Sequence, residues 1–403
     1  MDHIQQTIPD NTSVIRYFFI EKQLFALLTD NAMSQIFPLD LDSVEENMSV
    51  LAAQGLDIKK TSTALHDLHR KLWLPFSKNI HHNNLIIIPD GILFNLNFEI
   101  LTPKKINSFK ELVTKSLLAD YTFSYQYSLL LLNSENKPSG IIDNFVAFAP
   151  GFLDEQKETY GSSRKDSLEI DKGYFYLLPQ PFSIALATKM KKNFGGSTFL
   201  LEESTKQSFK TNAGNHKIIH IGTHAESNND YPEFSRLIFA KNTAGNDEDN
   251  SLFVDEIYNC NLRSNLTTLT ACETGKPGYQ EGEGMISLAH AFNYAGSESI
   301  LTGLWKIDEQ ASSLLLETFY NNLAKGFRKD EALRQAKITY LQNINGRMLA
   351  PQYWAGLVIM GDTSPIQLNQ NTSFWFLAIL GFIFLFVGGY FIFRKKINTT
   401  SLP

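Results

Sequence analysis

The sequence predicts an α/β protein with a mainly parallel sheet that is covered by helices on both faces. Short apolar runs of strand length recur along the chain, and each ends at a polar, Gly-rich or Pro-containing segment. Amphipathic helical patterns lie between these runs, and strands that alternate with helices build parallel sheets. The chain has 403 residues, of which 43% are apolar and 19% charged, a composition typical of a globular protein.

The first half of the domain is expected to span residues 13–200. Residues 1–12 are polar and predict a flexible N-terminus, and residues 13–29 predict two strands around a turn at Glu21–Gln23. The remaining elements follow from apolar runs and helical periodicity. We expect helices within 41–80, at 109–118, 124–132 and 181–194, strands at 85–88, 145–148 and 198–201, and a loop at 154–172.

The second half, residues 201–362, is expected to carry the chemistry. The same patterns predict strands at 217–223, 266–270, 299–304 and 354–360, and helices at 285–294, 310–324 and 330–343. A linker is expected at 363–373.

The central stretch is Leu266–Gly284, LTTLTACETGKPGYQEGEG. A buried strand, Leu266–Thr270, leads to Cys272 and then to a polar, Gly-rich loop. This order places the thiol at the carboxyl edge of the sheet, where ligands bind in open α/β folds. A thiol at such an edge is accessible, and nearby N–H groups can lower its pKa.

A second buried strand, Lys217–Thr223, ends at His224. If the two strands are neighbours, His224 and Cys272 lie side by side, which is the minimum for nucleophilic catalysis by cysteine. The other cysteine, Cys260, is expected to be a buried structural thiol, and the two cysteines lack the CxxC spacing of a zinc site. His216 and His220 do not make a metal site with His224, because steps of four along a strand cover about 13 Å.

Four further residues are candidates for substrate binding. Glu283 and Gly284 lie in the loop after Cys272, which could line a cleft or be a plain loop. Trp305 and Asp308 follow a strand that ends at the same predicted edge; Asp308 could receive a basic substrate side chain or act as a helix N-cap.

The charge pattern bears on partners. The net charge is −6 with Lys and Arg scattered, which argues against a nucleic-acid partner. The end of the chain predicts a membrane segment. Residues 374–393 are apolar and uncharged over the length of a bilayer-spanning helix, and a basic tail, 394–403, follows. We therefore predict a single-pass membrane protein anchored in the lipid bilayer through residues 374–393. Its side of the membrane stays open, because the positive-inside rule favours an external domain while no signal peptide is visible.

Several long motifs resemble CHAT domains, which are caspase-like domains associated with tetratricopeptide repeats. The motifs are LIIIPDGILFNLNFEIL, IIHIGTHAES, TACETGKPGYQEGEG, AFNYAGSESILTGLWKIDEQAS, FYNNLAKGFRKDEALRQAK and YWAGLVIMGD, and the resemblance covers residues 13–362. It implies a caspase-like three-layer fold of the caspase–separase group, with a His–Cys dyad that falls on His224 and Cys272. Many relatives carry helical repeats before this domain, whereas this chain shows no 34-residue period.

These observations together predict a membrane-anchored cysteine endopeptidase that needs neither a metal nor a cofactor. Its partners would be a protein or peptide substrate and a repeat-containing or activating protein. Two alternatives remain open: a catalytically silent CHAT-like scaffold or docking module, and an enzyme that is latent until a partner binds.

Overall fold

The computed structural model describes residues 5–52, 56–133, 143–163, 171–226, 228, 231–241, 250–270, 278–280, 284–286, 288–306, 308–369, 387 and 390. By its internal contacts the chain divides into two units, Met1–Gln367 and Leu368–Pro403. The account below concerns the first unit.

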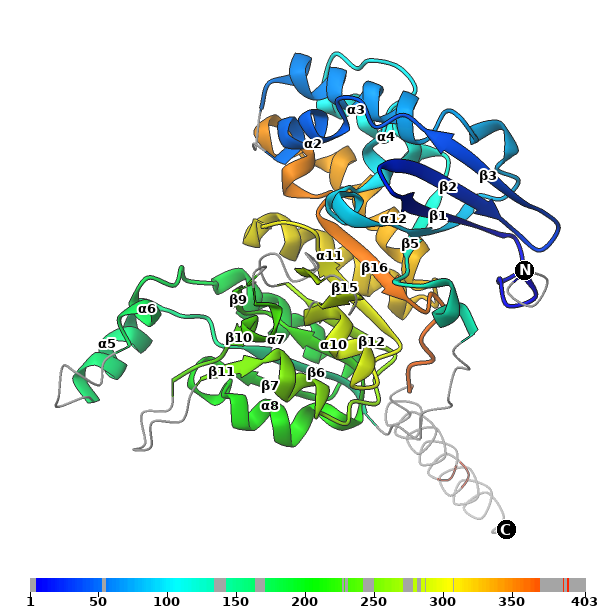
Figure 1. The fold of residues 1–403 in the computed structure, drawn as a ribbon. Helices are drawn as coiled ribbons and strands as arrows, with labels where there is room; N and C mark the ends of the chain where they lie inside the picture. The colour runs from blue at the N-terminus through cyan, green and yellow to red at the C-terminus, as the bar shows by residue number, and fades with distance from the viewer. Residues whose placement is uncertain are drawn as a thin grey trace, which may run out of the picture. The chain divides into compact units, whose positions relative to one another are not determined.

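One large sheet organises this unit (Figure 1). Its strand order is β3-β2-β1-β4-β5-β16-β15-β12-β8-β6-β7. In chain order the strands are β1 (Thr12–Ile20), β2 (Gln23–Thr29), β3 (Ser34–Leu39), β4 (Asn84–Ile88), β5 (Thr122–Tyr125), β6 (Asp143–Ala149), β7 (Ser197–Leu200), β8 (His216–Ile221), β12 (Leu266–Leu269), β15 (Ser299–Gly303) and β16 (Leu357–Gly361). The predicted α/β fold with a mainly parallel sheet is confirmed.

Nine of the eleven strands form two parallel groups that run in opposite directions, and β2 and β3 extend the sheet beyond β1 by antiparallel pairing. Strands β1, β4, β5 and β16 are parallel to one another, and so are β15, β12, β8, β6 and β7. The antiparallel pair β15–β16 joins the two groups. Because carboxyl ends meet at one edge only within a parallel group, β8, β12 and β15 all end at the same edge.

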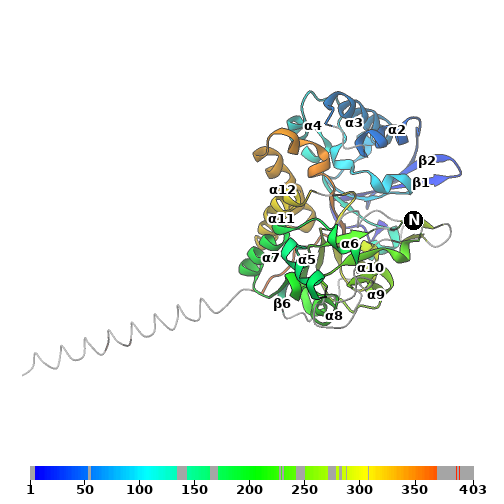
Figure 2. The same cartoon turned by 90° about the vertical axis from the view of Figure 1, so that its left-hand side faces the viewer.

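Helices cover both faces of the sheet. Figure 2 shows α7, α11 and α12 together along one side and α9 and α10 on another. The helices are α2 (Val44–Ala52), α3 (Ile58–Leu72), α4 (Leu112–Lys115), α5 (Asp154–Ser163), α6 (Lys172–Phe175), α7 (Pro181–Phe194), α8 (Lys206–Asn212), α9 (Val254–Tyr258), α10 (Leu288–Tyr294), α11 (Glu309–Ala324) and α12 (Lys329–Asn343). Proline at the first turn begins α7, and Gly195, with φ of 75°, follows its last residue.

A single apolar core runs through both halves of the unit. Its fully buried aromatic side chains include Trp73, Phe98, Phe148 on β6 and Phe209 on α8. A smaller cluster includes Ile8, so part of the segment predicted as a flexible N-terminus packs against the sheet. Burying an aromatic or large aliphatic side chain contributes about 1.5–3 kcal/mol, so these clusters hold the strands in place.

Two small sheets accompany the large one. β9 (His224–Glu226), β10 (Arg236–Ile238) and β11 (Ser251–Phe253) form an antiparallel sheet. β13 (Gly278–Gln280) and β14 (Gly284–Ile286) form a hairpin.

Several predicted elements differ in the structure. The helix expected at 124–132 is wrong, because Thr122–Tyr125 is the fully buried strand β5 and a 3-10 turn, Leu129–Asn133, follows. The loop expected at 154–172 contains α5, and the helix expected from Met285 begins at Leu288, after β14. A short apolar run carries too little periodicity to separate these states.

The predicted membrane localisation is also wrong. In the part of the chain that the structure describes, no helix is both long and apolar enough to cross a bilayer. The apolar run at 374–393 lies outside the described residues apart from Val387 and Tyr390. The prediction rested on the hydropathy of the sequence alone.

Candidate active site

The site begins where two neighbouring strands end. β8 and β12 pair in parallel, with Ile221 opposite Leu269, so the two strands are neighbours, which is the condition for placing His224 beside Cys272. Beyond this pair the Thr270 N–H donates to the Ile221 carbonyl at 3.1 Å. Cys272 follows two residues later, and it lies outside the described residues. The structure therefore describes the strand that leads to Cys272, and the dyad itself stays a prediction.

His224 begins strand β9, three residues beyond the end of β8. The hydroxyl of the preceding Thr223 is buried and donates to the Ile238 carbonyl on β10. Because β9 pairs with β10, with His224 opposite Ile238, the backbone at His224 is held in a strand.

The imidazole of His224 is partly exposed and has a fixed orientation. Its Nε2 lies 2.8 Å from the backbone carbonyl oxygen of Leu178. A carbonyl can only accept, so Nε2 carries the proton in this contact and donates it. In the neutral ring Nδ1 is then the unprotonated nitrogen, and it is free to accept a proton.

The Leu178 carbonyl comes from the segment between α6 and α7. Pro179 follows Leu178, and a residue before proline is restricted to extended conformations. The Gln180 N–H donates to the Gly151 carbonyl at 2.7 Å, which ties this segment to the end of β6. The ring of Phe152 lies against the imidazole, with 5.0 Å between the centroids of the Phe152 and His224 rings.

The surroundings keep the His224 imidazole neutral. Burial lowers the pKa of His224, and the positive charges of Lys306 and Lys157 lower it further, while the hydrogen bond to Leu178 raises it. The net effect is a pKa below the ordinary imidazole range. A neutral imidazole is the form that can act as a general base near pH 7.

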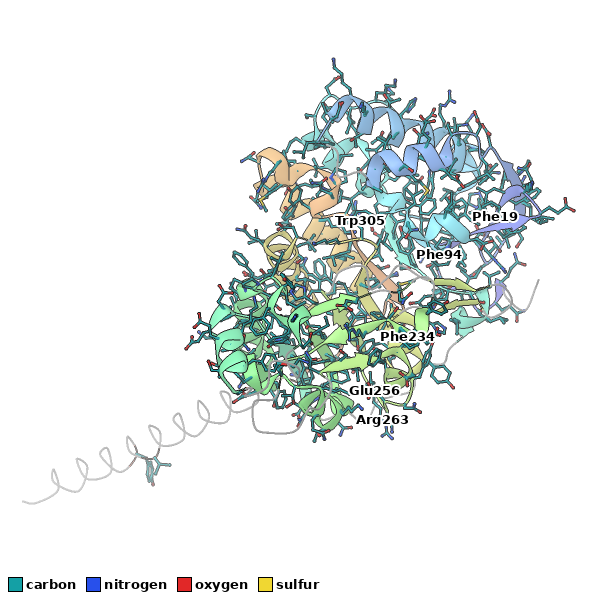
Figure 3. The ribbon with its side chains drawn as sticks, turned by 60° about the vertical axis from the view of Figure 1, so that its left-hand side comes forward. Phe19, Phe94, Phe234, Glu256, Arg263 and Trp305 are labelled. Atoms are coloured by element: carbon teal, nitrogen blue, oxygen red, sulfur yellow. The ribbon has the colours of Figure 1, made fainter. Side chains whose placement is uncertain are left out.

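Trp305 and Asp308 lie together beside the end of β15. Figure 3 shows Trp305 where the two halves of the unit meet. The indole Nε1 donates to the Gln352 carbonyl at 3.1 Å, and a Cβ at Gly356 would lie 3.0 Å from that nitrogen. Gly356 therefore allows the indole to pack directly on the backbone that leads into β16.

Asp308 is exposed and is the N-cap of α11. Its Oδ1 accepts the N–H of Ala311 at 2.8 Å, as expected for one of its two predicted roles. The neighbouring Glu309 accepts the Ser183 N–H at 2.9 Å, and burial raises the pKa of the Glu309 carboxyl.

A pocket of about 750 Å³ opens beside Trp305 and Asp308. Its other wall comes from the first half of the unit, where α2 contributes Met48 and Leu51 and the turn after β4 contributes Ile92. The lining mixes apolar and polar residues, with Glu45 and Asp308 as acidic groups and Lys306 as a basic one. A cavity of this size accommodates a side chain or a short peptide segment.

The remaining predicted residues have different outcomes. Gly284 is the first residue of β14 and pairs with Gln280, whereas Glu283 lies outside the described residues. The β8 histidines have separate surroundings: His220 is buried against the Tyr320 hydroxyl, and His216 lies 3.8 Å from Asp143. Within the described ranges no group of three or more His, Cys, Asp or Glu residues could hold a metal ion.

The sequence interpretation missed the Leu178 carbonyl and the α2 wall of the pocket. Every residue carries a backbone carbonyl, so residue type gave no signal for Leu178. The Leu-Pro-Gln-Pro run at 178–181 was the available clue, because two prolines fix the backbone on either side of Gln180.

The CHAT domain family model matches residues 62–362, well over half of the chain. Human tetratricopeptide repeat protein 28 is 32% identical over 91 residues, which are 23% of this chain and 4% of that protein. This chain therefore spans a small fraction of that relative's length.

Solved structures resemble this chain in fold. Saccharomyces cerevisiae separase, in its complex with securin, gives a TM-score of 0.54 at 10% identity, over 89% of this chain and 30% of the separase chain. The Arg-specific cysteine proteinase gingipain R gives a TM-score of 0.44 at 8% identity, over 81% of this chain and 75% of that one. At this identity the likeness to separase concerns the fold alone.

Proposed function

The chain belongs to the CHAT domain family, and we propose that it is a cysteine endopeptidase in which His224 and Cys272 form the catalytic dyad. The observation that carries the proposal is the orientation of His224. Its Nε2 donates to the Leu178 carbonyl, which leaves Nδ1 as the nitrogen that can accept a proton, and the strand that leads to Cys272 ends beside the strand that precedes His224. This arrangement supplies a general base where a nucleophile would need one.

In this mechanism the Nδ1 of His224 takes the proton of the Cys272 thiol. The thiolate attacks the carbonyl carbon of a peptide bond, and the imidazolium returns the proton to the departing amine. The resulting thioester is hydrolysed by water, which His224 activates in turn. The Leu178 carbonyl stabilises the imidazolium because it accepts the hydrogen bond from Nε2. It has the role of the third group that orients the base in a nucleophile–base pair.

The pocket beside Trp305 is the proposed site for a substrate side chain. Asp308 keeps one carboxylate oxygen beyond its N-cap contact, and the group is exposed. A basic substrate side chain would pair with Asp308, while its aliphatic part would contact the Trp305 indole. Glu283 and Gly284 are proposed to border the same substrate cleft from the hairpin after Cys272.

A regulating protein partner is part of the proposal. The family relative carries tetratricopeptide repeats in its name, and the separase structure contains securin. By analogy, we propose that a protein partner controls access to this site or presents the substrate to it.

Thiol reactivity in the full chain tests the dyad. Cys260 is an internal reference, because it is half-buried and burial raises the pKa of its thiol. We expect iodoacetamide to alkylate Cys272 faster than Cys260 at pH 7, and His224→Asn to slow Cys272 alone. Equal slow rates at both cysteines, unchanged in His224→Asn, would contradict the dyad and favour a silent docking module.

A further inference from the structure

A buried lysine lies behind the segment that orients His224. Lys157 is on α5, and 9% of its side chain is exposed. Its Nζ lies 2.7 Å from the backbone carbonyl oxygen of Leu177 and 3.3 Å from Asp154 Oδ1. Lysine is seldom buried unless it is paired, and among the described residues these two groups are the partners of the Lys157 ammonium.

Asp154 does not explain the burial of Lys157. The Asp154 side chain is 82% exposed, and an ion pair with so exposed a partner is screened by solvent and contributes little. The carbonyl of Leu177 is the closer partner, and this contact is partly buried. The ammonium group therefore serves mainly as a charge-assisted donor to the backbone of the segment between α6 and α7.

This segment is anchored on both sides of the residue that contacts His224. Lys157 holds the carbonyl of Leu177, one residue before Leu178, and the N–H of Gln180, two residues after it, donates to Gly151. Between these anchors the Leu178 carbonyl points to Nε2 of His224 at 2.8 Å.

The backbone that carries Phe152, whose ring lies against the imidazole, is unusual as well. Gly151 has φ of 76° and the following Phe152 has φ of 49°, a left-handed conformation that non-glycine residues rarely adopt. Phe152 is fully buried in a small cluster with Tyr160 of α5 and Tyr174 of α6. Such conformations persist where the surroundings enforce them and are frequent at functional sites. Helix α5 is thus connected to the imidazole in two ways. Lys157 contacts the segment that carries the Leu178 carbonyl, and Tyr160 packs with Phe152, whose ring lies against the imidazole.

We propose that Lys157 is a positioning residue: its ammonium group fixes the Leu177–Leu178 backbone so that the Leu178 carbonyl holds His224 in the Nε2–H tautomer. Lys157 touches neither the imidazole nor a substrate. Its consequence for catalysis rests on the dyad proposed above, whereas its effect on the tautomer of His224 does not.

The tautomer can be measured directly, without any substrate. In the full chain labelled with ¹⁵N-histidine, the His224 ring nitrogens are assigned by comparison with His224→Asn. We expect the unmodified protein near pH 8 to show a protonated Nε2 and an unprotonated Nδ1. In Lys157→Met the freed segment should give a mixture of the two tautomers, and Lys157→Arg, which keeps a cationic donor, should restore much of the original state.

Asp154→Asn is the matched control on the same helix. It removes the negative charge of the exposed partner of Lys157 but leaves the contact to Leu177, so the tautomer should not change. An unchanged Nε2–H tautomer in folded Lys157→Met would overturn the proposal. If Lys157→Met does not fold, Lys157→Gln decides in its place, since it keeps a neutral donor of shorter reach and should show the mixture.

The kinetic readout separates this proposal from the dyad. If the unmodified protein cleaves peptides, Lys157→Met should lower kcat about tenfold with little change in KM, because a misplaced base affects the chemical step. If the unmodified protein cleaves nothing, the dyad fails, and the tautomer measurement still decides the role of Lys157.

Discussion

The segments that follow β4 and β8 use polar groups in opposite ways. After β4 the chain turns into the core, where Asn97 and Glu99 are buried and their polar atoms are paired within the protein. After β8 it leaves the core, and the partly exposed His224 donates from Nε2 to the Leu178 carbonyl, which leaves Nδ1 as the nitrogen that can accept a proton. The polar groups of the first segment therefore stabilise the contact between the halves of the unit. In the second segment Nδ1 of His224 can take part in chemistry.

The buried network after β4 links three parts of the chain. Asn97 donates to the Ala355 carbonyl before β16, and Glu99 pairs with Lys337 of α12 at 2.5 Å. Burial lowers the pKa of Lys337, and the charge and hydrogen bond of Glu99 oppose this effect. Ala355 immediately precedes Gly356, on which Trp305 packs, so this cohesion also supports the wall of the pocket.

The largest effect is expected at the exposed segment. His224→Asn should reduce kcat/KM by about 10² to 10⁴, because it removes the general base. In the unmodified protein activity should rise with pH through a pKa below 6.5, since only neutral His224 accepts a proton and its pKa is lowered. Steady-state kinetics from pH 4 to 8 would check both points, with His82→Asn, a histidine of the first half, as the control that should change neither.

Substitutions in the buried network after β4 should lower the free energy of unfolding. Lys337→Met leaves the Glu99 carboxylate buried without its partner, which costs about 3–5 kcal/mol of unfolding free energy. The double variant Lys337→Met/Glu99→Leu should recover most of this loss, because an apolar pair replaces the ion pair. Denaturant titration measures both, and a loss below 1 kcal/mol in the single variant would contradict the role given to the pair.

A smaller effect is expected for His220, on the same strand as His224 but inside the core. His220 is fully buried beside the Tyr320 hydroxyl, and burial lowers the pKa of His220 to about 4. The unfolded chain binds a proton at His220 more readily than the folded protein does. The contribution of neutral His220 to the free energy of unfolding is therefore complete above about pH 6.5. It is lost as pH falls towards 4, by about 3 kcal/mol in total.

Denaturant titrations at several pH values between 4 and 7 check this expectation. His220→Gln should be less stable at pH 7 and should show a shallower loss of stability on acidification. An identical pH dependence in both proteins would assign the acid sensitivity to other groups.

The smallest effects are expected at Asp308. Asp308→Asn keeps the N-cap of α11 but removes the charge, so stability should change by less than about 0.5 kcal/mol. If the carboxylate receives a basic side chain, kcat/KM for basic peptides should fall about 10- to 100-fold while peptides with apolar residues are unaffected. Asp308→Ala removes the cap as well and should cost about 1 kcal/mol more. Equal losses for basic and apolar peptides would remove Asp308 from substrate recognition.

Sequence reasoning succeeded where burial on both faces made the signal strong. The strands predicted at Leu85–Ile88 and Leu266–Thr270 lie in the parallel groups of the sheet. The parallel pairing of β12 with β8 explains why a histidine and the approach to a cysteine meet at one edge. Strand β3 escaped notice because it is an exposed edge strand that contains Pro38. Its antiparallel pairing with β2 makes it a strand, whereas its residue pattern does not predict one.

The polar details of the site could not be predicted from residue type. Lys157 looked like one of many charges in a loop at 154–172, and only its burial and its distance to Leu177 distinguish it. The pocket combines α2 with Trp305, which are separated by most of the domain in sequence. Apolar content alone also misled, since the run at 374–393 suggested a membrane anchor.

Peptide cleavage by the full chain and by its Cys272→Ala variant tests the central claim most directly. A peptide library presented to both proteins should be cut by the unmodified chain and not by Cys272→Ala, with both proteins equally stable in denaturant. The residues that precede the cut would then reveal whether the pocket beside Asp308 selects basic side chains. Cleavage of the same peptides at the same rate by both proteins would contradict the dyad.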